Sequence, residues 1–177
     1  GDFVSHVRMM KTDYEDTGLA QLFGMPFVVL RKPVPFDTTT LNFNWQVWDT
    51  KAFSLYSRST EKIDKKGADM AIAAVCRFLS RMNVLNYNVY GGYESTVLIE
   101  EELVSLRSTA SGLYIPHVKS FDSVERGQVL ADIIDPLTGV TVAQTEAPED
   151  GIVFFAKDSP LVMENETLFK IVNKLHK

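Results

Sequence analysis

The sequence contains few of the side chains from which most metal sites and nucleophilic sites are built. Its 177 residues include one cysteine and three histidines. Because Cys76 has no second cysteine to pair with, the fold must be stable without an intrachain disulfide, which fits a reducing compartment. The apolar residues around Cys76 recur with helical spacing, and no histidine is near it in sequence. We therefore expect a buried, inert thiol on the apolar side of a helix rather than a nucleophile.

Long apolar runs and clusters of basic residues are also missing. A mean hydropathy of -0.03 and the lack of a long apolar run argue against a membrane-spanning helix. The formal net charge of -5 argues against nucleic acid or an anionic membrane as the main partner. With 45% hydrophobic residues the chain can bury one good core or two small ones, so we expect a globular protein. Together with the hydropathy and the single cysteine, this predicts a soluble, cytoplasmic protein.

Two stretches near the C-terminus, residues 108–134 and 145–172, present the same features in the same order. Each has small residues leading to a glycine, an apolar strand, a turn at Gly127 or Asn165 where a positive φ is tolerated, and a closing apolar strand. This repeat predicts an all-β, barrel-sandwich-like domain, the shape shared by biotinyl and lipoyl carriers. Carriers need a lysine in the hairpin that joins the two halves, and residues 134–140 contain none. The sequence therefore disfavours a carrier role.

The first half of the chain alternates between extended and helical patterns. Residues 26–31 form an apolar run suited to a buried strand, and residues 52–57 predict a second core strand. Residues 41–48 alternate between apolar and polar and predict a half-exposed strand, whose aromatic side chains either line an acyl pocket or belong to the core. After Asp64, a good N-cap, apolar residues recur at intervals of three and four and predict a helix that packs by one stripe. The stripe consists of Ala68, Ala71, Ile72, Val75, Phe78, Leu79 and Met82.

The change of pattern along the chain predicts two domains. Residues 1–90 read as the C-terminal part of an α/β domain, and residues 91–177 read as the β domain. A short helix over residues 13–23 that ends at Gly24 completes the α/β part. The acidic run at residues 100–102 is expected to be a solvated strand edge. One helix over a few strands leaves one face of a sheet bare, so the α/β part is expected to be incomplete.

Several segments resemble the later half of the succinylglutamate desuccinylase/aspartoacylase family, namely residues 3–8, 23–26, 38–45, 52–56 and 60–64. The members of this family are zinc-dependent deacylases with a zinc-carboxypeptidase-like α/β domain and a C-terminal β domain. The resemblance implies hydrolysis of the amide bond of an N-acyl amino acid or related small molecule. It also implies a zinc ion held by two histidines and a glutamate, and a separate glutamate that transfers protons.

The metal-binding motifs of that family are not present in this sequence. The family supplies an HxxE pair and a later histidine, whereas the histidines here are His6, His117 and His176, none of them in an HxxE motif. His6 lies in the element that follows the third ligand in the family, where a hydrogen-bonded structural role is expected. We therefore expect zinc in a parent enzyme, by resemblance, and no metal or other cofactor for this chain alone.

The resemblance also suggests candidate site residues. The family places its proton-transfer glutamate at the end of a strand like residues 52–57, where strand register puts Tyr56, and Glu61 is the nearest carboxylate. Glu61 is thus the catalytic candidate, with a solvated turn residue as the alternative. Arg8 and Tyr56 are the candidate substrate-binding residues. Arg8 is expected to bind a substrate carboxylate in a bidentate pair, or else to form a surface ion pair. Residues 159–163 lack the aromatic hydroxyl that aspartate-specific members use, which argues against N-acetylaspartate as substrate.

Three functions remain open from the sequence. The first is the C-terminal portion of a zinc-dependent deacylase, which is inactive as this chain alone. The second is a non-catalytic binding or assembly module that keeps the deacylase fold, and the third is the disfavoured carrier. A homo-oligomer is compatible with each of them.

Overall fold

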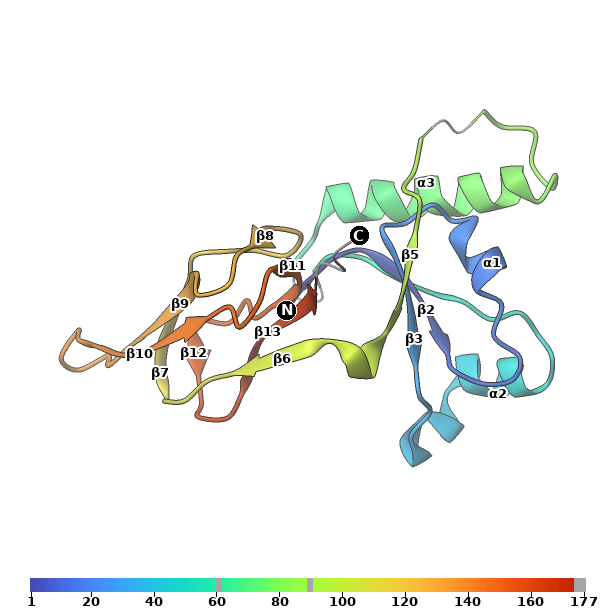
Figure 1. Ribbon diagram of the computed structural model, residues 1–177. Coiled ribbons are helices and arrows are strands. Elements are labelled where there is room, and N and C mark those ends of the chain that lie inside the picture. Colours follow the sequence, from blue (N-terminus) through green and yellow to red (C-terminus); the bar gives the residue numbers. More distant parts are fainter. Residues whose placement is uncertain (60–61, 89–90, 174–177) are drawn as a thin grey trace. The chain divides into compact units, whose positions relative to one another are not determined.

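The computed structural model describes residues 1–59, 62–88 and 91–173. The chain forms two compact units, an α/β unit of Ser5–Glu102 and a β unit that combines Gly1–Val4 with Leu103–Lys177. The expected boundary at residue 90 therefore differs from the one observed at Glu102. The reason is that strand β5 (Thr96–Ile99) pairs with the α/β sheet. The elements of both units are labelled in Figure 1.

The α/β unit is built on a four-stranded sheet in the order β4-β2-β3-β5. Its other strands are β2 (His6–Met10), β3 (Phe27–Arg31) and β4 (Ser54–Tyr56). The three strands β2, β3 and β5 run parallel to one another, and β4 is antiparallel to β2. The strands predicted at residues 26–31 and 52–57 are confirmed as β3 and, in a shorter form, as β4.

Among the described residues of this unit, three segments are α-helices and two are 3-10 turns. They are α1 (Thr17–Gln21), α2 (Leu41–Val47), α3 (Lys65–Arg81), η1 (Pro35–Thr39) and η2 (Glu100–Glu102). The first helix is shorter than the predicted 13–23 because Asp16 caps it at the N-terminus by accepting a hydrogen bond from the Leu19 amide. Within the described ranges, none of the helices combines the length and the apolar character needed to span a bilayer.

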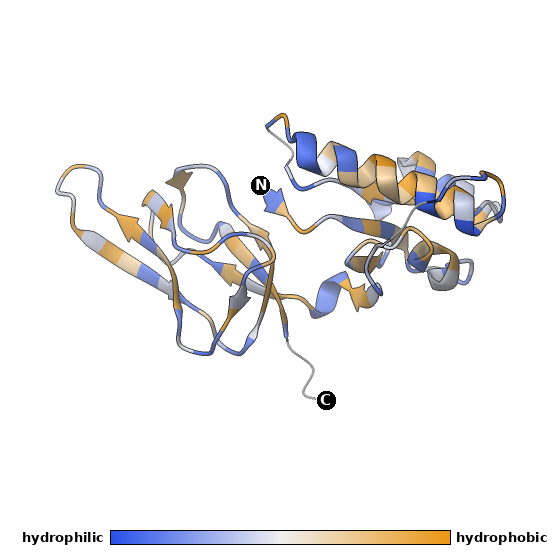
Figure 2. Cartoon of the chain, turned by 90° about the horizontal axis from the view of Figure 1, so that it is seen from above, coloured by the Kyte–Doolittle hydropathy of each residue, from blue (hydrophilic) through white to orange (hydrophobic). Residues whose placement is uncertain are grey.

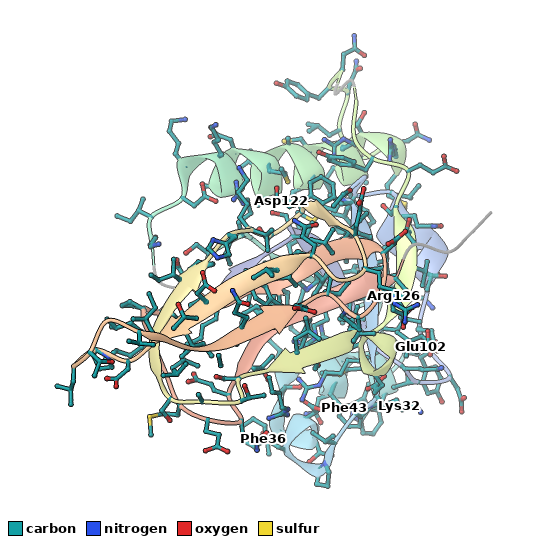
Figure 3. All side chains as sticks on the ribbon, turned by 60° about the vertical axis from the view of Figure 1, so that its left-hand side comes forward. Lys32, Phe36, Phe43, Glu102, Asp122 and Arg126 are labelled. Atoms are coloured by element: carbon teal, nitrogen blue, oxygen red, sulfur yellow. The ribbon has the colours of Figure 1, made fainter. Side chains whose placement is uncertain are left out.

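The strand predicted at residues 41–48 is wrong, because this segment is helix α2. Thr40 caps the helix by accepting a hydrogen bond from the Phe43 amide, and this local contact outweighs the period-two pattern. Trp45 and Trp48 are 51% and 82% exposed, so the expected core role is also wrong for these two rings. In Figure 3, Phe36 and Phe43 are labelled on the η1 and α2 segment.

The residue of α2 that does enter the core is polar. Gln46 is 0% exposed, and its side-chain amide accepts a hydrogen bond from the Met10 amide and donates one to the Met10 carbonyl. A second donor bond reaches the Thr12 hydroxyl at 2.7 Å. Gln46 therefore satisfies backbone groups where β2 ends, and it ties α2 to the sheet.

Helix α3 begins where the sequence predicts, but the face that packs on the sheet is rotated from the predicted stripe. Asp64 is the N-cap and accepts a hydrogen bond from the Lys66 amide. The buried positions are Gly67, Ala74 and Arg77, whereas Ile72 is 63% exposed. In Figure 2 this helix is coloured hydrophilic at its beginning and mostly hydrophobic in its middle. Cys76 lies on α3 as a free, half-buried cysteine, so its expected full burial is corrected.

Arg77 explains part of this rotation. Its guanidinium donates hydrogen bonds to the backbone carbonyls of Phe23 and Gly24, just beyond α1. Burial and the neighbouring charge of Arg81 lower the pKa of Arg77. The long side chain satisfies carbonyls that the sheet and α1 leave open, and the apolar period of the helix gives no hint of this role.

The β unit consists of two sheets. One has the order β1-β11-β13-β6, with β8 also paired to β11, and the other has the order β10-β9-β7-β12. All pairings within these two sheets are antiparallel. The strands are β1 (Asp2–Phe3), β6 (Val104–Arg107), β7 (Gly112–Pro116), β8 (Ser123–Val124), β9 (Val129–Ile134), β10 (Thr141–Glu146), β11 (Gly151–Ala156), β12 (Leu161–Val162) and β13 (Thr167–Asn173).

The two repeats seen in the sequence exchange strands with each other. Short strand β8 of the first repeat pairs with β11 of the second, and β12 of the second pairs with β7 of the first. Two strands that begin before the repeats pair in the same crossed sense: β6, just before the first repeat, pairs with β13 of the second, and β10, which begins before the second repeat, pairs with β9 of the first. Gly127 and Asn165 adopt the expected positive φ, 79° and 67°. Because each repeat completes the sheet of the other, one continuous core forms between them.

Candidate functional site

The candidate site lies in the α/β unit, at the beginning of β2 and the end of β4. Antiparallel pairing places His6 opposite Tyr56 and Arg8 opposite Ser54. On the other side of β2, the parallel strands β3 and β5 lead the chain to η2, which begins at Glu100. Residues from distant parts of the sequence thus meet around one arginine.

Arg8 is the centre of this cluster. Its Nη1 atom donates a hydrogen bond to the Tyr56 hydroxyl at 3.2 Å, and its Nη2 atom forms an ion pair with the Glu100 carboxylate. The guanidinium carbon also lies 5.4 Å from the centre of the Tyr56 ring, within cation-π range. The side chains of Arg8 and Glu100 are 17% and 24% exposed, so the pair is partly shielded from water but still reachable. The site is therefore a carboxylate-binding arginine that already holds a carboxylate.

One donor of Arg8 remains unsatisfied. The Nε atom is buried and has no hydrogen-bond partner among the described residues. A buried donor without a partner costs on the order of 1–3 kcal/mol, more for a charged group, unless a water molecule or a ligand satisfies it. The buried Nε–H group of Arg8 is thus left without an acceptor among the described residues.

His6 packs against the same tyrosine. The two rings are stacked with their centroids 4.9 Å apart and an angle of 7° between their planes, and His6 is only 3% exposed. This stacking holds the Tyr56 ring in place under the guanidinium. It supports the structural role that the sequence predicted for His6.

The described residues do not offer a zinc site. Among them, no group of three or more His, Cys, Asp or Glu side chains is placed so that it could hold a metal ion. His117 lies in the β unit, where its Nε2 atom is 2.8 Å from Asp132 Oδ2. A three-ligand zinc centre of the kind expected for the parent family therefore does not fit the described part of the chain.

The structure brings together two of the three predicted site residues, Arg8 and Tyr56. The third, Glu61, lies outside the described residues, as does His176. The sequence did not predict a role for Glu100, because residues 100–102 were expected to be a solvated strand edge. That expectation is wrong: the segment is the 3-10 turn η2, and Glu100 pairs with Arg8 across 92 positions of sequence. Only the strand order β2-β3-β5 reveals the proximity, and no local pattern encodes it.

No protein-family model matches this sequence, and no curated protein matches it. Several solved structures match this chain. The product-bound ectoine utilization protein EutE (DoeB) from Ruegeria pomeroyi matches 96% of this chain and 53% of its own, at 13% identity and a TM-score of 0.77. A succinylglutamate desuccinylase/aspartoacylase from Rhodobacter sphaeroides matches 99% of this chain and 55% of its own, at 15% identity and a TM-score of 0.77.

A third match is a putative succinylglutamate desuccinylase/aspartoacylase from Shewanella frigidimarina, at 17% identity and a TM-score of 0.73, which covers 98% of this chain and 51% of that protein. The chain thus spans about half the length of the proteins it resembles. It has the fold of that half of the succinylglutamate desuccinylase/aspartoacylase family, in agreement with the sequence resemblance.

Proposed function

We propose that this chain binds a small molecule bearing a carboxylate, of the N-acyl amino acid type, and that it does not catalyse hydrolysis by itself. The observation that carries this proposal is the ion pair between Arg8 and Glu100, supported by Tyr56. A planar guanidinium beside an aromatic hydroxyl is well suited to a ligand carboxylate. Glu100 then acts as an internal substitute that the ligand displaces.

Exchange of one carboxylate for another is energetically feasible. The ligand restores the ion pair that Glu100 gives up, so the net cost is mainly that of exposing Glu100, which is already partly solvated. The ligand can also accept a hydrogen bond from the Tyr56 hydroxyl, which can donate as well as accept.

The proposed binding role corresponds to the second of the three functions that the sequence leaves open, a non-catalytic binding or assembly module that keeps the deacylase fold. In this proposal the α/β unit is a partial zinc-carboxypeptidase-like domain, and the β unit is barrel-sandwich-like, with a core shared by its two repeats. EutE was solved with its product bound, which supports the idea that a protein of this fold holds a small molecule.

Titration with N-acetylglycine tests the proposal, and uncharged N-acetylglycinamide serves as the matched ligand control. We expect the Glu100→Gln chain to bind N-acetylglycine about tenfold more tightly than the wild type, because an amide competes less well for the guanidinium. Arg8→Gln should abolish binding, and the uncharged ligand should bind to none of the three proteins. Calorimetry that detects no N-acetylglycine binding to Glu100→Gln would contradict the proposal.

The fold match favours a second candidate, in which the chain is the C-terminal portion of a zinc-dependent deacylase whose metal ligands come from protein outside this chain. In such a parent enzyme Glu61 is the proposed proton shuttle. Glu61→Gln should then lower turnover by roughly a hundredfold or more while the zinc content stays unchanged. Tyr56→Phe is the matched control, since it removes one hydroxyl from the strand position that the family gives to its glutamate. A loss of turnover in Tyr56→Phe alone would move the role to Tyr56.

A further inference from the structure

An open cavity lies in the α/β unit where helices α1 and α3 end and strand β5 begins (Figure 1). Its volume is about 380 Å³, which is within the usual range for small-molecule sites. Glu100 follows the other end of β5, so the cavity is separate from the cluster around Arg8. The lining residues are Gln21, Arg81, Gly92, Tyr93, Glu94 and Ser95.

Hydrogen bonds fix the wall of the cavity that leads into β5. The Gln21 side-chain amide donates to the Ser95 carbonyl at 3.1 Å, and the Ser95 hydroxyl donates to the Met25 carbonyl at 2.6 Å. The Tyr93 amide donates at 2.9 Å to a backbone carbonyl in the turn after α1. Glu94 therefore lies between two anchored residues, and the backbone of this wall is held in place before any ligand binds.

Arg81, the last residue of α3, lines the opposite part of the cavity with a partly used guanidinium group. Its Nη1 atom donates a hydrogen bond to the Leu22 carbonyl at 2.9 Å, which holds the side chain against the end of α1. The Nε and Nη2 atoms of Arg81 have no partner among the described residues. These two nitrogens form one edge of the guanidinium, and such an edge can bind both oxygens of a carboxylate.

Glu94 supplies the opposite charge. It is exposed, and its carboxylate forms no ion pair or hydrogen bond with Arg81 or with any other group in the described ranges. A positive and a negative side chain thus line one cavity without neutralising each other. This arrangement suits a ligand that carries both a carboxylate and an ammonium group.

A second guanidinium group favours the carboxylate at Arg81. Arg77 lies one turn earlier on α3, and a Cβ atom on Gly92 would lie 2.8 Å from its Nε atom. The wall of the cavity is therefore in close contact with Arg77 at Gly92. Burial, and after it the charge of Arg81, lower the pKa of Arg77. Because the two guanidinium groups repel each other, an anion bound at Arg81 is stabilised there and a cation is not.

We infer that this cavity binds a free α-amino acid, with the ligand carboxylate on Arg81 and the ligand ammonium group on Glu94. An α-amino acid carries these two groups on one carbon atom, and the volume of the cavity leaves room for its side chain. This site is additional to the proposed carboxylate site at Arg8 and does not depend on it. Because the cavity is open to solvent, we expect a dissociation constant on the order of 1 mM.

NMR titration of the isotope-labelled chain with glycine tests the inference. Glycine should shift the backbone amide signals of residues 92–96 in a saturable manner. Glycinamide, which lacks the carboxylate, and N-acetylglycine, which lacks the ammonium group, should each bind at these residues at least about tenfold more weakly. N-acetylglycine that is as effective as glycine at residues 92–96 would overturn the inference, because the cavity would then recognise a carboxylate alone.

Substitutions test the two charges separately. Arg81→Gln and Glu94→Gln should each weaken glycine binding about tenfold. Glu94→Gln breaks no contact of the Glu94 side chain with the described residues, so a loss of binding in this variant does not come from unfolding. Lys66→Gln and Glu102→Gln are the controls matched in charge, and both should bind glycine as the wild type does. Glycine that leaves the signals of residues 92–96 unmoved, or that binds Glu94→Gln as tightly as the wild type, would refute the amino acid site.

Discussion

Gly112 and Gly151 begin equivalent strands of the two repeats, and both lie against the backbone of a neighbouring strand. A Cβ atom on Gly151 would lie 2.6 Å from the Val172 carbonyl oxygen, and one on Gly112 would lie 2.5 Å from the Ile134 carbonyl oxygen. Backbone oxygens in a sheet cannot move aside as a flexible side chain can. The glycines that reveal the repeat in the sequence are therefore required by close strand contact.

Replacement of Gly151 by alanine should destabilise the protein by about 1–3 kcal/mol, since the new methyl group forces the strands β11 and β13 apart. Urea unfolding measures the difference. Gly18→Ala is the matched control, because its nearest neighbour is a side-chain oxygen at 3.6 Å and the residue lies in helix α1. There alanine should be neutral or stabilising by up to about 1 kcal/mol.

The hydrogen bonds of Asp132 predict how the stability of the fold depends on pH. Hydrogen bonds from Gln144, at 2.8 Å, and from His117 hold the pKa of the Asp132 carboxyl below its ordinary value of 3.8. Because the pKa is lower in the folded state than in the unfolded state, the ionised group stabilises the fold above the ordinary pKa. That contribution is lost as the pH falls through the lower, folded-state value.

Asp132→Asn should therefore have a lower free energy of unfolding than the wild type at pH 7. The difference between the two proteins should be smaller when unfolding is measured at pH 3. Gln144→Ala, which keeps the carboxylate but removes the largest cause of the shift, should reproduce part of the effect. If the difference in free energy of unfolding is the same at both pH values, Asp132 affects stability through something other than its charge.

At the scale of elements, the N-cap of α3 is the feature that the sequence predicts best. Asp64→Ala should cost about 1 kcal/mol in the free energy of unfolding, because the Lys66 amide loses its acceptor. Asp64→Ser should retain most of the stability, since serine caps nearly as well. Asp69→Ala, which removes the exposed 2.8 Å pair with Lys65, should cost only about 0.5 kcal/mol or less. Equal losses at Asp64 and Asp69 would rule out capping as the cause.

Helices α2 and α3 show where sequence patterns stop being informative. Alternation at residues 41–48 predicted a strand, but a single side-chain cap at Thr40 and the buried Gln46 favour a helix instead. The existence and start of α3 followed from its period, yet its packing face did not. Burial of Arg77 against the carbonyls after α1 is a tertiary interaction, and an apolar period cannot report it.

At the scale of the whole molecule, local sequence patterns were enough to predict three features: the repeat, the α/β character and the family resemblance. The order of the strands could not. Arg8 and Tyr56 were found as candidates, whereas Glu100 was missed because its contact with Arg8 depends on the β2-β3-β5 order. Nor could the sequence show that Asp2–Phe3 pairs with β11.

Limited proteolysis tests this arrangement of the chain. The first cuts should fall in residues 83–94, whose described members are exposed. The two fragments should then elute together in native buffer, because β1 pairs with β11 and β5 pairs with β3 across the cut. They should separate only in denaturant. Fragments that separate in native buffer would show that the pairings across the cut are too weak to hold the two parts together.

The pairing of β1 with β11 also sets an order of events while the protein is being made on the ribosome. Asp2 and Phe3 leave the exit tunnel well before their partners Ala156 and Phe155 are synthesised. The α/β unit, which is continuous from Ser5 to Glu102, can close while the β unit must wait. Until β11 has been synthesised, residues 2 and 3 have no strand to pair with. A chaperone that binds nascent chains would therefore encounter them unpaired.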